Sequence, residues 1–292
     1  MPQTTVKNAL SQTWLGLHDK MLAHVPGTIA GSDIEELHRF RVALRKTRAL
    51  LKLFEKSLPD VAYFVAEFRW LSSITGPVRD LDVLLQYAAE RLPTALEIRA
   101  AAIAPLIEIL RADRIAAQQK LQHVLVSARW RKLATRWQSF LADELLAHAS
   151  LPALDVSIRI AVNPPLLKQC IALLKNGARV DSETPASTLH QLRIRGKRTR
   201  YLLDTMRPFV GAHWGTKVSK QLIFLQDVLG QHQDAVATIA RLNEVKVQLS
   251  PRSPAQATLQ QWIELLQDNR DAARAGFATA FSHFAKACRE LE

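Results

Sequence analysis

The stretch EELHRFRVALRKTRALL at residues 35–51 returns later in the chain as STLHQLRIRGKRTRYLL at residues 187–203, an offset of 187 − 35 = 152. A second motif, LSSITGPVRDLDVLL at residues 71–85, matches LQDVLGQHQDAVATI at residues 225–239, an offset of 225 − 71 = 154. Because two motifs recur in the same order at almost the same spacing, the chain is predicted to contain an internal duplication.

The segments around these motifs are predicted to be helical nearly throughout. The chain has 292 residues, of which 48% are hydrophobic and only 10 are glycine, and no run of alternating β-branched residues indicates a sheet. Helix starts are indicated at Ser32, Thr94, Thr184 and Ser253 by capping residues or a following proline. The predicted fold class is all-α, and Pro105 is expected to bend the fifth helix. Helices are expected near residues 4–25, 33–57, 59–75, 78–92, 94–126, 129–148, 163–177, 185–207, 212–229, 232–249 and 254–288.

The duplication predicts a single domain, residues 1–292, made of two similar helical repeats. The repeats are expected at about residues 1–148 and 162–292, joined by a linker near 149–161. In each repeat an amphipathic helix precedes the first motif and a long helix follows the second.

Charge and cysteine content narrow the class of protein. Lys and Arg total 39 and Asp and Glu total 27, and the net charge of +12 favours partners that carry phosphate. Cys170 and Cys288 are far apart in the sequence and outside any zinc-binding spacing, so neither a disulfide framework nor a structural zinc site is expected. Without a long apolar run or a secretory signal, we expect a cytoplasmic protein that is not inserted in a membrane.

The basic residues of each first motif are predicted to form one row along a helix. At 100° per residue they fall within about 80° of arc, beside the apolar packing face. Such a row is costly unless an anion neutralises it, and arginine suits two-pronged contact with phosphate oxygens. A solvated basic face is the alternative for one copy, but the row recurs in the second; Arg195 departs from it and has no assigned role. The predicted rows are His38, Arg41, Arg45, Arg48 and Lys52, and His190, Arg193, Lys197 and Arg200.

The two histidines are interpreted as members of a phosphate site, because no HxxxH, HxH or HExxH pattern indicates a metal site. Bound phosphate would raise the pKa of an imidazole, which predicts tighter binding at about pH 6 than at about pH 8.

The aspartates of the second motif are not expected to hold a metal ion. Asp80 and Asp82 are two residues apart on a helix and point in different directions, so they cannot easily share one ion. Asp80 and its counterpart Asp234 are expected either to cap a helix start or to pair with a basic residue of the neighbouring motif helix.

With LHRFRVALRKTRALL, LHQLRIRGKRTRYLL, TGPVRDLDVLL and LGQHQDAVATI, the sequence resembles the CHAD family, the conserved-histidine α-helical domain, across essentially its whole length. The resemblance implies two helical bundles related by a pseudo-twofold axis, with basic residues of both lining a groove that binds inorganic polyphosphate. It also implies association with polyphosphate or storage granules, and with polyphosphate- or triphosphate-metabolising enzymes. By position, it adds Lys46 and Arg198 to the binding set, while Gln233 stands where the first copy has Arg79.

The expected function is therefore polyphosphate binding without catalysis, with no catalytic residue, cofactor or metal. Nucleic-acid binding is the nearest alternative, but only Tyr201 lies near either row for stacking against bases. A third hypothesis is a metal-dependent polyphosphatase or triphosphatase, and a fourth is a scaffold that docks granule proteins or a partner enzyme. The sequence does not indicate the oligomeric state or the preferred polyphosphate chain length.

Overall fold

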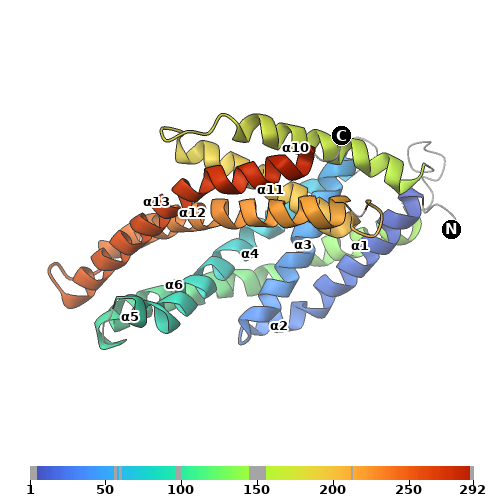
Figure 1. Cartoon of the computed structure of the whole chain (residues 1–292). Helices are drawn as coiled ribbons and strands as arrows, with labels where there is room; N and C mark the ends of the chain where they lie inside the picture. The colour runs from blue at the N-terminus through green and yellow to red at the C-terminus, as the bar shows by residue number, and fades with distance from the viewer. Residues whose placement is uncertain are drawn as a thin grey trace. The chain divides into compact units, whose positions relative to one another are not determined.

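The computed structural model describes residues 5–55, 58, 61–96, 100–144, 156–211 and 213–289, and its labelled elements are all helices (Figure 1). Within these residues the remaining regular pairing is an isolated antiparallel bridge between Thr5 and Ser157. The all-α prediction is confirmed. Residues 149–155 of the predicted linker lie outside the described part of the chain, and α10 begins shortly after it, at Ile158.

The helix bounds follow the sequence signals closely at several places, most clearly in α11 and α13. The elements in chain order are α1 (Val6–Ala23), α2 (Val25–Ala30), α3 (Ile34–Phe54), α4 (Val61–Glu90), α5 (Leu92–Ala95), α6 (Ala100–Leu125), α7 (Ala128–Ser139), the π-helical η1 (Phe140–Glu144), α10 (Ile158–Gly177), α11 (Ala186–Met206), the π-helical η3 (Trp214–Val218), α12 (Ser219–Lys246) and α13 (Pro254–Arg289).

Two predicted helix breaks are wrong. Helix α4 continues through Gly76 and Pro77, and helix α12 continues through Gly230. The apolar positions explain why, because buried residues recur at helical spacing on both sides of each glycine, as Leu71, Thr75 and Val78 do in α4. Burial of this continuous face outweighs the local preference of glycine and proline for a helix end. Asp80 and Asp234 consequently lie inside helices and do not cap a helix start.

The predicted caps are confirmed at one end of the chain and corrected near the other. Ser253 accepts a hydrogen bond from the Gln256 backbone N–H at 3.2 Å, directly before α13. Helix α3 is capped by Asp33, whose side chain accepts from the Glu35 N–H at 2.8 Å, and not by the predicted Ser32. Thr94 lies within the short helix α5 and does not start a helix.

The helices group into two compact units that do not follow the two sequence repeats. Unit 1 consists of residues 1–79, 116–169 and 201–215, and unit 2 of residues 80–115, 170–200 and 216–292. Helices α4, α6, α10 and α11 each contribute residues to both units. The first predicted basic row, on α3, therefore belongs to unit 1, and the second, on α11, belongs to unit 2.

The core of unit 1 is an aromatic cluster. The rings of Trp14, Phe64, Phe68 and Phe140 each lie 4.8–5.4 Å from the ring of Trp137, measured between centroids. These side chains come from α1, α4, α7 and η1, so the cluster joins segments distant in sequence.

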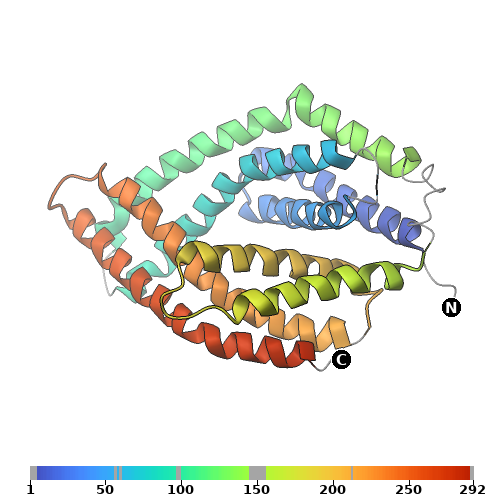
Figure 2. The ribbon, with the colours of Figure 1, turned by 90° about the horizontal axis from the view of Figure 1, so that it is seen from above.

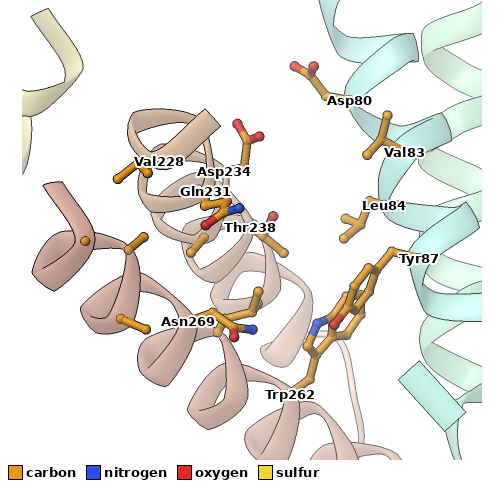
Figure 3. Close-up of a pocket in the computed structure, with 15 residues that line it drawn as sticks. Asp80, Val83, Leu84, Tyr87, Val228, Gln231, Asp234, Thr238, Trp262 and Asn269 are labelled. Atoms are coloured by element: carbon orange, nitrogen blue, oxygen red, sulfur yellow. The ribbon is translucent and has the colours of Figure 1, made fainter. Parts of the chain in front are cut away.

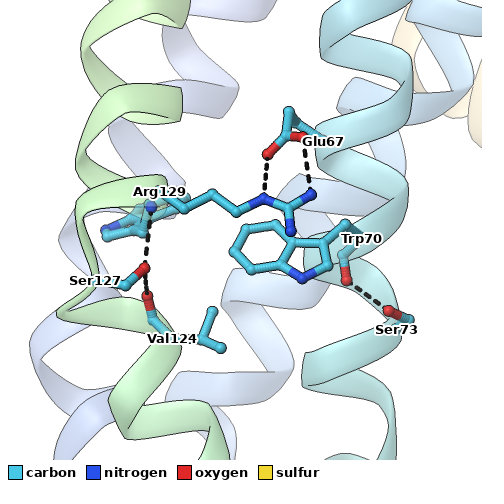
Figure 4. A network of polar contacts seen from close by, with 7 residues as sticks. Glu67, Trp70, Ser73, Val124, Ser127 and Arg129 are labelled. Atoms are coloured by element: carbon cyan, nitrogen blue, oxygen red, sulfur yellow. Dashed lines mark hydrogen bonds and ion pairs between the residues drawn. The ribbon is translucent and has the colours of Figure 1, made fainter.

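A polar contact at the surface of unit 1 ties α7 to α4 (Figure 4). The Arg129 guanidinium donates two hydrogen bonds to the Glu67 carboxylate, at 2.8 and 2.9 Å, and lies 3.8 Å from the centre of the Trp70 ring. Ser127 caps α7 directly before this arginine, because its hydroxyl accepts from the Trp130 N–H. The position of Arg129 against α4 is thus set by the start of its own helix.

In unit 2 the long helices α12 and α13 form an antiparallel hairpin and run side by side (Figure 2). Buried Leu222, Leu229 and Leu242 of α12 and Trp262 and Phe284 of α13 supply part of its core.

The two cysteines also meet in unit 2, although they are distant in sequence. Both are buried free thiols that hydrogen bond with each other, and this contact together with burial raises the pKa of Cys170. The end of α13 is therefore packed against α10.

Candidate functional site

The first basic row lies on α3, whose opposite face is buried. Phe40, Leu44 and Leu51 of this helix are at most 1% exposed, and this packing holds the helix in place. The basic side chains beside that face are half-buried, apart from exposed Lys52. The predicted residues of the first row thus lie on one helix, beside its buried face.

Two arginines of this row are held by α4. Arg41 Nη1 donates to the Thr75 hydroxyl at 2.9 Å and to the Ser72 carbonyl at 3.4 Å, and Arg48 Nη1 donates to the Ser72 hydroxyl at 2.8 Å. These acceptors are uncharged, and the bonds orient the two guanidinium groups. A held guanidinium loses less conformational entropy when it binds an anion.

Two other members of the first row have contacts that affect their role. Arg45 Nε donates to the Arg41 carbonyl at 3.3 Å, and the Arg45 guanidinium lies 5.5 Å from the centre of the Tyr201 ring, in the same unit. Lys52 pairs with Glu55 at 2.5 Å. Lys52 therefore contributes less net positive charge to the first basic row than its sequence suggested.

His38 is half-buried at the start of the row, and its pKa is lowered, first by burial and then by the charge of Arg79. Arg79 is a candidate site residue that lies outside the predicted set. It lies on α4, and its Nη1 atom is buried without a hydrogen-bond partner among the described residues. Its position directly before the repeated Asp80 was the available signal, but the change to Gln233 in the second copy obscured it.

In unit 2 the second row lies on α11. Arg193 Nη2 donates to Asp234 Oδ1 of α12 at 2.7 Å, which confirms for Asp234 the predicted pairing with a basic residue of the neighbouring motif helix. A Cβ at Gly230 would approach Arg193 at 4.0 Å, and a Cβ at Gly76 would approach Arg41 at 3.6 Å. In both copies, therefore, an arginine of the basic row lies against the glycine of the second motif.

Several buried polar atoms around the second row have no hydrogen-bond partner within the described residues. They are Nδ1 of His190, Nε of Arg193, and both side-chain polar atoms of Gln226. Gln226 packs so closely on α11 that a Cβ at Gly196 would lie 1.9 Å from its Nε2 atom, which explains a glycine inside this basic helix. Buried donors without partners cost about 1–3 kcal/mol each unless a ligand or water satisfies them.

A long helix fixes the turn that precedes each basic helix. In unit 1, Gln118 Nε2 of α6 donates to the carbonyls of Thr28 and Ile29 at 2.9 and 3.1 Å, next to Gly31, which has a φ of 68°. In unit 2, Arg274 of α13 donates to three carbonyls of the turn before α11, those of residues 181, 182 and 184. These bonds hold the end of α2 against α6 and the turn before α11 against α13.

The remaining predicted residues lie on the same two helices. Lys46 is half-buried on α3, Lys197 and Arg200 are half-buried on α11, and Arg198 is exposed. Arg195 is also exposed, and nothing in the structure explains it. The two rows belong to different units, and their action on one anion stays a prediction.

The described residues contain no group of three or more His, Cys, Asp or Glu side chains that could hold a metal ion. Asp82, which the sequence analysis separated from Asp80, is buried and pairs with Arg114 at 3.0 Å. Among the helices described, none is both long enough and apolar enough to cross a membrane.

The sequence matches a known domain family and two curated proteins. The profile of the CHAD domain matches residues 14–243. Two curated relatives from Mycobacterium tuberculosis, the uncharacterized proteins MT2285 and Rv2226, are each 26% identical to the chain over 208 residues, which is 70% of the chain. The chain spans 39% of the length of these relatives.

Two solved structures have the same fold. The crystal structure of the CHAD domain from the plant Ricinus communis is 24% identical, with a TM-score of 0.74 over 99% of this chain and 93% of that one. PptA from Streptomyces chartreusis is 18% identical, with a TM-score of 0.71 over 96% of this chain and 100% of that one. The sequence match and the fold agree, and the chain belongs to the CHAD domain family.

Proposed function

We propose that the chain binds inorganic polyphosphate through the basic residues of α3 and α11, and that it does so without catalysis. The observation that carries the proposal is the set of buried donors beside the two rows, Arg79 Nη1 and Arg193 Nε, which have no partner among the described residues. Phosphate oxygens are strong acceptors that would satisfy such donors and neutralise the rows at the same time.

A linear polyanion fits the extended form of each row. Successive basic residues of a row are three or four positions apart, so they follow the helix axis at about 5 Å intervals. Binding releases the counterions of the polyanion, so affinity should fall steeply as salt rises. Family membership supports the same ligand, because the CHAD resemblance implies polyphosphate binding and, in cells, association with polyphosphate granules.

The test removes two charges from the rows and compares the result with two charges removed elsewhere. Arg45→Ala with Lys197→Ala should weaken binding of long-chain polyphosphate strongly, while circular dichroism shows unchanged helicity. The control pair Arg111→Ala with Lys132→Ala lowers the net charge equally, from exposed positions outside both rows. Equal losses in the two double variants, or no loss in the first, would refute the assignment.

Nucleic acid is a weaker candidate than polyphosphate on one specific observation. Arg45 lies over the Tyr201 ring, the aromatic side chain that the sequence analysis had put forward for stacking against bases. If tRNA or single-stranded DNA displaces polyphosphate at comparable phosphate concentration, binding is not selective for polyphosphate. Release of phosphate on adding magnesium would overturn the non-catalytic part of the proposal.

A further inference from the structure

Unit 2 contains a cavity of about 570 Å³. None of the described residues that line it belongs to the basic row of α11. It is open to solvent on one side and is lined by residues of α4 from Asp80 onward, by α12 and by α13 (Figure 3). Cavities of roughly 300–1,000 Å³ are typical of sites for small organic molecules. The size therefore suits a small organic ligand.

The walls of this cavity are mainly apolar. Tyr87 and Trp262 stack with ring centroids 5.8 Å apart and planes at 12°, and Figure 3 shows this pair at one end of the cavity. Val83, Leu84 and Val228 line the space between this pair and the other end. A ligand that fills the cavity must therefore have an apolar body.

The charge of the lining has one sign. Among the described residues that line the cavity, the charged ones are Asp80 and Asp234, which lie at the end away from the aromatic pair in Figure 3. In a chain with a net charge of +12, this acidic end is an exception. A cation can bind at this end in competition with Arg193, which pairs with Asp234.

We propose that this cavity binds an organic ammonium cation with an apolar body, whose charge lies at Asp234 and whose body contacts Tyr87, the ring that Trp262 supports from behind. The Asp234 side chain is 73% exposed, so a ligand can reach its carboxylate. Aromatic faces add to the attraction for a cation or for the apolar part attached to it. Gln231, Thr238 and Asn269 supply uncharged hydrogen-bonding groups on the same walls.

Asp234 connects this cavity to the second basic row, because it also accepts the hydrogen bond from Arg193. A cation that pairs with Asp234 competes with Arg193 and leaves its guanidinium more available to phosphate. By linkage, polyphosphate must then strengthen binding of the cation by the same factor. This coupling rests on the proposed function, whereas the binding of the cation does not.

The first experiment measures binding of 2-phenylethylammonium by calorimetry, with 2-phenylethanol as a neutral probe of similar shape and at fixed ionic strength. The ammonium probe should bind at least about threefold more tightly than the alcohol, and Asp234→Asn should remove this difference. Asp227→Asn is the matched control, because it removes the same charge from α12 outside the cavity lining. Equal binding of both probes, or equal effects of both variants, would overturn the proposal.

A second variant blocks the cavity without endangering the fold. A Cβ at Gly276 would meet nothing nearer than a Val228 carbon at 4.0 Å, and leucine favours a helix more than glycine does. Gly276→Leu should therefore fold normally and lose the probe. Retained binding in a folded Gly276→Leu protein would place the probe elsewhere and refute the site.

The final experiment measures polyphosphate affinity with and without saturating 2-phenylethylammonium. Wild type should bind polyphosphate more tightly with the probe, and Asp234→Asn should not, although direct association of probe and polyphosphate is the same for both. If polyphosphate binds but the probe does not, the cavity proposal fails and the proposed function stands. If the probe binds but polyphosphate does not, the proposed function fails alone.

Discussion

Replacing Asp234 by asparagine should make the protein bind polyphosphate more tightly. The Asp234 carboxylate neutralises Arg193 at 2.7 Å, with the two side chains 73% and 15% exposed. Because solvent screens the aspartate, the pair is worth only about 0.5–1 kcal/mol. Asparagine keeps an oxygen that can accept the same hydrogen bond, so Arg193 stays oriented while its charge becomes available. The gain in affinity should then be about two- to fivefold.

The same substitution should change the salt dependence. If Arg193 neutralises one more phosphate, the slope of log affinity against log salt should steepen by about 0.7–0.9. The assay is a fluorescence titration with long-chain polyphosphate at four salt concentrations, run in parallel on wild type, Asp234→Asn and Asp227→Asn. The reasoning is refuted if Asp234→Asn binds no more tightly than Asp227→Asn, or if its slope stays at the wild-type value.

Three further predictions concern protonation and backbone geometry. Polyphosphate affinity should rise as pH falls from about 8 to about 6, and His38→Gln should flatten this rise. Burial and Arg79 lower the pKa of His38 in the free protein, and bound phosphate raises it, so protonation favours binding. A series of binding measurements across this pH range checks the prediction. The pKa of His232 is lowered by burial first and by nearby arginines, so the unfolded chain binds more protons. Its stabilising contribution is present above the unfolded pKa of about 6.5 and declines below it. Urea unfolding from about pH 7.5 to 5 should show a larger decline in wild type than in His232→Gln, which keeps His38 with its lowered pKa. Gly31→Ala should lower the free energy of unfolding by about 2–4 kcal/mol, because φ is 68° and a Cβ would displace Gln118 from two carbonyls; an unchanged unfolding midpoint would contradict this.

The sequence predicted the helical content and most helix positions because burial periodicity and capping residues are local signals. The bounds of α13 illustrate this, since Ser253 and Pro254 mark its start in both sequence and structure. The errors at Gly76–Pro77 and Gly230 arose where a local signal for a helix end competed with a buried face that continues across it. Tertiary packing decided both cases, and local propensity could not reveal it.

The positions of the candidate basic residues on two helices were predictable, but their charge partners were not. All eleven predicted residues lie on α3 or α11, because a row of positive charge beside an apolar face is a property of one helix. Whether a charge is neutralised depends on a second helix or turn, as Arg193 with Asp234 shows. Arg79 was missed for the same reason, because its nearness to His38 joins α4 to α3.

Arg41 and Arg193 hold aligned positions in the two copies, and each donates to a side chain of the facing helix. Arg41 donates to the Thr75 hydroxyl, whereas the position of Thr75 is taken in the second copy by Leu229, which has no acceptor. Arg193 lies against Gly230 as Arg41 lies against Gly76, so both guanidinium groups need an acceptor on the facing helix. In the second copy the Asp234 carboxylate, about one turn beyond Gly230 on α12, accepts the hydrogen bond from Arg193. The bond between Arg193 and Asp234 thus joins the second basic row to the acidic end of the cavity.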